Sequence, residues 1–73
     1  MASKLHKSYI KYGYTELYSI GSTSYLGHQG TLHYVDPIQL DKLLAEMAPM
    51  TSDFSKAEYL KECIEKGRFK RLN

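Results

Sequence analysis

Three histidines and one cysteine are the side chains of this chain that a metal ion would bind first. His28 and His33 lie five residues apart, Cys63 follows thirty residues later, and His6 is near the start. Zinc sites usually take two closely spaced ligands from a turn and two more from a helix. The spacing here matches no such pattern, so we expect no metal site. We expect His28 in a turn, His33 in a strand near the edge of a sheet, and Cys63 buried on a helix.

The candidate nucleophiles and acid–base pairs are equally unconvincing as catalytic groups. Cys63 lies in the middle of an expected helix, without the helix start or neighbouring cation that activates a thiolate. The serines between residues 19 and 24 lack a Gly-x-Ser-x-Gly motif. Glu58 and Glu62 are one helical turn apart, which is typical of a solvated helix face. The sequence therefore predicts a protein that is not an enzyme and has no cofactor.

The tetrad Gly27-His28-Gln29-Gly30 has the letters of the GxxG loop with which KH domains hold a nucleic-acid backbone. That loop joins two helices. Here Tyr25-Leu26 and Thr31-Leu32 flank the tetrad, and both pairs favour strands. We therefore expect a hairpin turn.

Tyrosine is the residue type that indicates what the chain does. The chain has seven tyrosines and no tryptophan, and six of the tyrosines lie in the first half: Tyr9, Tyr12, Tyr14, Tyr18, Tyr25 and Tyr34. A tyrosine ring can fill a core, but its hydroxyl needs water or a partner. A domain of 73 residues cannot bury so many rings fully. Some should remain on the surface as a contact face, which indicates a binding module.

Charge is segregated along the chain although the formal net charge is only +2. Acidic residues concentrate in residues 36–65, and the end of the chain carries Lys66, Arg68, Lys70 and Arg71. Two interpretations stay open: solvated helix faces with a basic tail, or two patches that meet one large partner. The basic cluster and exposed rings also leave nucleic-acid binding open, although acidic helices would repel a phosphate backbone.

The elements that would position these side chains are clearest in the second half. Asp36 can cap a helix that begins with Pro37, and Pro49 ends it near Ala48. Its apolar stripe follows helical spacing: Leu40, Leu43, Leu44 and Met47.

A second helix follows from another set of signals. Ser55 and Glu58 have the spacing of a capping box, and Gly67 is a helix stop. The residues expected on its buried side are Ala57, Leu60, Cys63 and Ile64.

The first half predicts strands. Residues 12–20 alternate, with Tyr12, Tyr14, Tyr18 and Ile20 on one side, and 23–26 and 31–35 are two further strand candidates. We expect an α+β fold in which a three-stranded antiparallel meander is followed by two short helices. One sheet face packs on the helices, and the other exposes alternate Tyr, Thr and His.

The whole chain, 1–73, is expected to form a single domain. Its parts are a flexible N-terminal arm (1–8), a β-rich part (9–35), a helical part (36–66) and a basic tail (67–73). One cysteine, no long apolar run and no signal peptide predict a protein of the cytoplasm, with no membrane contact. We expect a monomer when free.

In size and character, with no cofactor motif and a single cysteine, Cys63, the chain resembles the small host-takeover proteins of bacteriophages. Among them it is similar to the antitermination proteins that bind RNA polymerase, such as that of a Xanthomonas phage. The resemblance implies a non-enzymatic regulator that binds the β′ subunit of bacterial RNA polymerase and alters transcription initiation and termination in the host cytoplasm.

From the residues we expect partner contacts in two sets. The arm and the first tyrosines would contact the partner protein through Lys4, Leu5, Lys7, Tyr9, Tyr12 and Tyr14. The tail would add electrostatic attraction through Arg68, Lys70 and Arg71. Two alternatives stay open. One is a nucleic-acid-binding regulator that uses the basic tail and exposed tyrosines. The other is a different phage inhibitor, which would block a host defence protein as anti-CRISPR proteins do.

Overall fold

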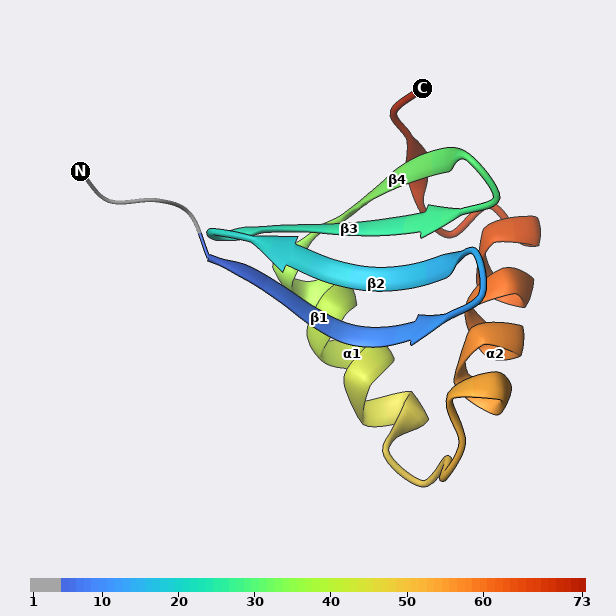
Figure 1. The fold of residues 1–73 in the computed structure, drawn as a ribbon. Coiled ribbons are helices and arrows are strands. Elements are labelled where there is room, and N and C mark those ends of the chain that lie inside the picture. Colours follow the sequence, from blue (N-terminus) through green and yellow to red (C-terminus); the bar gives the residue numbers. More distant parts are fainter. Residues whose placement is uncertain (1–4) are drawn as a thin grey trace.

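The computed structural model describes residues 5–73 as an antiparallel sheet followed by two helices (Figure 1). The elements in chain order are β1 (His6–Tyr12), β2 (Thr15–Ile20), β3 (Thr23–His28), β4 (Thr31–Val35), α1 (Pro37–Met47), α2 (Asp53–Glu65) and β5 (Lys70–Arg71). The strands lie side by side in chain order, β1-β2-β3-β4-β5. The α+β class is therefore as expected, but the sheet has five strands rather than three.

The two additional strands lie at the two ends of the chain. The expected strand over 12–20 is interrupted by a turn at Gly13-Tyr14, and Gly13 has a φ of +58°. Residues 6–12 pair with β2 as β1, so His6–Ser8 form part of a strand rather than a flexible arm. At the other end Lys70–Arg71, expected in the tail, pair with β4. A two-residue strand is too short to show a period in the sequence.

The turn at Gln29-Gly30 confirms the hairpin expected from the Gly27–Gly30 tetrad, but Gly27 and His28 belong to β3, so the expectation that His28 lies in the turn is wrong. Gln29 has a φ of +48° and Gly30 a φ of +83°. Two successive left-handed residues are the geometry of a type I′ turn, whose twist suits an antiparallel hairpin. The Gln29 amide donates to the carbonyl of Tyr14 (3.0 Å). This bond fixes the β3–β4 turn beside the β1–β2 turn.

A bulge in β1 changes where its side chains lie. Ser8 pairs with Tyr18 and Ile10 with Leu17, so Tyr9 is an extra residue between them. Tyr9 is half-buried, and its hydroxyl accepts a hydrogen bond from Ser19 Oγ (3.0 Å). The bulge therefore places Tyr9 against the core.

Helix α1 confirms its predicted start. Asp36 is the N-cap, its carboxylate accepts from the amide of Gln39 (2.9 Å), and Pro37 is the first helical residue. The side-chain carbonyl of Gln39 accepts in return from the amide of Asp36 (3.3 Å). This reciprocal pair is a capping box.

The N-cap of helix α2 lies three residues before the predicted one. Ser52, not Ser55, is the N-cap, and the amide of Ser55 donates to Ser52 Oγ (3.1 Å). Starting there also brings Asp53 into the first turn, where its charge suits the helix dipole. The helix ends at Glu65, just before Gly67, whose φ is +72°. No helix within residues 5–73 is long and apolar enough to cross a bilayer.

Both helices lie on one side of the sheet, and the core fills the space between (Figure 1). Strand residues alternate between that inner side and an outer side. The buried apolar residues are Ile10, Leu17, Leu26, Val35, Leu43, Met47, Ala57, Leu60, Cys63 and Phe69. Five residues of the expected helix stripes belong to this set, and Leu40, Leu44 and Ile64 are partly buried against it. No element of the described residues lies over the outer side.

Candidate binding surface on the sheet

A row of three tyrosines crosses the outer side of the sheet. Tyr18, Tyr25 and Tyr34 come from β2, β3 and β4, and the strand register places Tyr18 opposite Tyr25 and Tyr25 opposite Tyr34. Residues directly opposite in antiparallel strands have their side chains on the same side. The rings of Tyr18 and Tyr25 are 5.6 Å apart, tilted by 33°, and Tyr34 is 37% exposed. We call these residues the tyrosine row.

Polar groups lie around the tyrosine row. The ring of His6 stands edge-on to Tyr18 at 5.1 Å, and its Nε2 is 3.6 Å from a carboxylate oxygen of Glu16. At the far end Lys70 lies opposite Tyr34. Burial, then the charge of Glu16 and the neighbouring Tyr25, raises the pKa of Tyr18 above its ordinary value. The Tyr18 hydroxyl is protonated at neutral pH, as an ordinary tyrosine is, and can donate a hydrogen bond.

The first expected contact residues lie along or before β1, at one edge of the sheet. Leu5 is 80% exposed, and Lys7 is exposed with its Nζ 5.1 Å from the ring centre of Tyr9. The Tyr9 ring itself is half-buried. Lys4 lies outside the described residues.

Tyr12 and Tyr14 lie at the turn end of the same edge. Tyr14 is 84% exposed, and the half-exposed ring of Tyr12 stands edge-on to Phe54 of α2 at 5.5 Å. Both tyrosines line a small hollow of about 180 Å³ together with His28. Tyr12 and Tyr14 are thus brought together, but apart from the tyrosine row.

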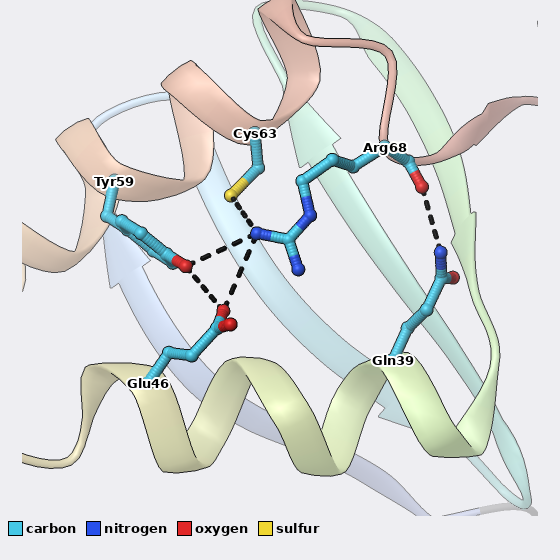
Figure 2. A network of polar contacts seen from close by, with 5 residues as sticks. All are labelled: Gln39, Glu46, Tyr59, Cys63 and Arg68. Atoms are coloured by element: carbon cyan, nitrogen blue, oxygen red, sulfur yellow. Dashed lines mark hydrogen bonds and ion pairs between the residues drawn. The ribbon is translucent and has the colours of Figure 1, made fainter.

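Arg68 is held within the molecule (Figure 2). Its Nη1 donates to Cys63 Sγ (3.1 Å) and to the Tyr59 hydroxyl (3.2 Å). The same nitrogen is 3.5 Å from a carboxylate oxygen of Glu46, to which Tyr59 also donates. The backbone carbonyl of Arg68 accepts from the Gln39 side chain (2.8 Å). These bonds fix the segment after α2 against both helices, so the guanidinium already has partners.

The hydrogen bonds and charges around Arg68 shift the pKa values of Glu46, Tyr59 and Arg68. Each shift favours the protonation state in which these residues bind one another. The hydrogen bond from Tyr59, then the charge of Arg68, holds the pKa of Glu46 below its ordinary value. The same bond raises the pKa of Tyr59. The hydrogen bond that Arg68 donates to the Tyr59 hydroxyl, together with the charge of Glu46, raises the pKa of Arg68. At neutral pH the network therefore consists of a carboxylate, a protonated phenol and a guanidinium. Each is in the state that its hydrogen bonds require.

Lys70 and Arg71 lie on β5, at the edge of the sheet opposite to β1. Lys70 shares the outer side with Tyr34, whereas Arg71 lies opposite His33 on the inner side. Strands are spaced by about 4.8 Å, so about 19 Å separates the two edge strands. The expected contact residues are thus divided between the two edges of the sheet. The tyrosine row, which was not among them, lies between these edges.

Comparison of the chain with protein-family models, curated proteins and solved structures found no match. Within the described part of the chain, no three His, Cys, Asp or Glu side chains are grouped as a metal site would require. The functional argument therefore depends on the chain's own side chains.

Proposed function

We propose that this chain is a non-enzymatic binding module that acts by covering part of a larger protein, with the outer side of the sheet as its contact surface. The observation that supports this proposal is the tyrosine row, Tyr18, Tyr25 and Tyr34, on a sheet face that no other described element covers. Tyrosine is among the residue types that contribute most to protein interfaces.

The packing of this face favours a protein partner. The backbone under the tyrosine row is paired on both sides, since β2, β3 and β4 are the inner strands of the sheet. A paired backbone loses little conformational freedom on binding, which reduces the cost of association. Polar groups such as His6, Glu16 and Lys70 surround the rings, as in interfaces with an apolar centre and a polar rim.

A specific complex would cover only a small part of the chain's surface. A standard interface takes about 800 Å² from each partner. That is about one sixth of the 5035 Å² of accessible surface of this chain. A contact centred on the tyrosine row and extending to Lys70 would include one of the expected residues, whereas Lys7 lies opposite the buried Ser19 and therefore on the inner side of the sheet.

For the partner we propose bacterial RNA polymerase, on the resemblance in size and character to phage proteins that bind it. In this proposal the module binds the β′ subunit in the host cytoplasm and changes initiation or termination by occupying a surface. Catalysis by the module itself is not required.

A second candidate function is single-stranded nucleic-acid binding. The observation that favours it is the side-by-side arrangement of Tyr18 and Tyr25 with Lys70 at the end of the row, because aromatic rings on a sheet stack bases while cations neutralise phosphates. The acidic helices lie on the other side of the sheet (Figure 1), so their repulsion of a backbone approaching the row is weaker than the sequence indicates.

Affinity capture from a nuclease-treated bacterial lysate at moderate salt separates these functions. We expect stoichiometric RNA polymerase subunits to be retained, with only a modest loss as salt rises, because the contact is mainly aromatic. Retention of nucleic acid alone, lost steeply with added salt, would replace the protein-binding function by the second candidate. Recovery of a host defence complex would keep the binding module and change its partner.

A further inference from the structure

A hollow on the inner side of the sheet lies away from the tyrosine row. It has a volume of about 390 Å³ and opens between the β3–β4 turn, the C-terminal part of α2 and β5. Its walls include His28, His33, Ile64, Phe69 and Arg71. No Asp or Glu lies among the residues that line it.

The polar wall of the hollow consists of groups that can donate hydrogen bonds to an anion. His33 is only 6% exposed, and its Nδ1 is 3.3 Å from the carbonyl of Leu26. The Nδ1 of His28 is 2.7 Å from Thr15 Oγ1. In each ring the contact occupies Nδ1 and leaves Nε2 as the nitrogen for a ligand. Nε2 of His28 is a donor when the Thr15 hydroxyl donates to Nδ1, whereas His33 Nδ1 donates to the Leu26 carbonyl, so its Nε2 donates to an anion only when the ring is protonated.

Arg71 supplies the permanent positive charge. It lies directly opposite His33 in the β4–β5 pair, so the two side chains are on the same side of the sheet. Within residues 5–73 its guanidinium is in no salt bridge or side-chain hydrogen bond, in contrast to Arg68. A free guanidinium can form two parallel hydrogen bonds with a carboxylate or phosphate.

The opposite wall is apolar. Ile64 is half-buried and Phe69 is 8% exposed, and both line the hollow. An inorganic ion would leave this wall unused, whereas an aromatic or aliphatic body attached to the anion would cover it.

We propose that this hollow binds a small organic anion, in which Arg71 and the two imidazoles hold a carboxylate or phosphate group and Ile64 and Phe69 cover an apolar body. The site is independent of the proposed function, because it lies on the other side of the sheet and requires no partner protein. In this proposal Arg71 binds a small ligand, beside a buried imidazole and an apolar wall, rather than a macromolecule.

Titration of the free, full-length protein with phenyl phosphate, benzoate and inorganic phosphate tests the proposal. The readout is the imidazole carbon–proton resonances of His28 and His33 by NMR. We expect saturable shifts of both rings with at least one aromatic anion, and weaker binding of inorganic phosphate. The two aromatic probes distinguish a phosphate from a carboxylate ligand.

Arg71→Gln is expected to weaken that binding about 10- to 100-fold, the usual effect of losing a charge-assisted hydrogen-bonded pair. Arg71→Lys should bind with intermediate affinity, since it keeps the charge without the paired donors. Lys70→Gln, a neighbour on the other side of the sheet, is the matched control and should bind as the unchanged protein does. Amide spectra verify that each variant is folded.

Non-saturable shifts with every probe, or equal losses in Arg71→Gln and Lys70→Gln, would overturn the proposal. Binding of inorganic phosphate as tightly as phenyl phosphate would also overturn it, because the apolar wall would then contribute nothing. Failure of any of these tests leaves the partner-binding function of the sheet untouched.

Discussion

Replacing Tyr25 with threonine is expected to weaken binding of the partner by roughly 30-fold, which corresponds to about 2 kcal/mol and is typical of a central interface anchor. Tyr25 lies at the centre of the tyrosine row, between Tyr18 and Tyr34. Its replacement by threonine removes the central ring of the three. Threonine is chosen because it is β-branched and suits a strand, so the sheet is retained.

The matched control for this variant is Tyr14→Thr. Tyr14 is the most exposed tyrosine, at 84%, but it lies in the β1–β2 turn rather than in the row. We expect Tyr14→Thr to change the dissociation constant for RNA polymerase by less than threefold, since loss of a peripheral contact costs little. Loss of binding in Tyr14→Thr with normal binding in Tyr25→Thr would move the contact surface to the turn end of the sheet.

Replacing Leu26 with alanine is expected to unfold a large part of the protein population at room temperature. Leu26 is fully buried on β3, the central strand of the sheet. Truncating a buried leucine costs about 2–5 kcal/mol, and the core of so short a domain supplies only about 3–5 kcal/mol. The free energy of unfolding should therefore fall close to zero.

Urea unfolding followed by circular dichroism measures this effect, with Leu5→Ala as control. Leu5 is the same residue type but 80% exposed, so its truncation should change the free energy of unfolding by less than about 0.5 kcal/mol. Equal, small shifts of the unfolding midpoint in both variants would contradict the position of Leu26 in the core.

The helices were predictable because their signals are local. Asp36 and Pro37 occupy the N-cap and first position of α1, as the sequence indicates. For α2 two serines compete for the cap, and Ser52 is used instead of Ser55. The buried side of each helix was predicted correctly, because helical spacing alone determines which residues share a face.

The sheet was predicted less completely because strand pairing is not local. Tyr12, Tyr14 and Tyr18 fit one alternating strand in the sequence, but Gly13 forms a turn within it. The turn separates Tyr12 and Tyr14 from Tyr18, which alone of the three lies in the tyrosine row. A shift in register moves side chains to the other face, so a missed turn changes the predicted surface.

The candidate surfaces depend on contacts between residues far apart in the chain. Tyr18 and Tyr34 lie in one row because of the register of β2, β3 and β4. Arg68 and Arg71 are three residues apart, yet one is held by Tyr59 and Glu46 and the other lies beside the hollow. From the sequence, both arginines were expected in one basic tail. Only the pairing of β5 with β4 separates them.

Site-specific photo-crosslinking tests most directly whether the outer side of the sheet is the contact surface. The photoreactive residue p-benzoylphenylalanine would replace Tyr34 in the row, or Glu62, which is exposed on α2 on the helix side. After mixing with purified bacterial RNA polymerase and irradiation, we expect a crosslinked polymerase subunit from position 34 and none from position 62. A crosslink from position 62 without one from position 34 would contradict the account, because the partner would then lie on the helices.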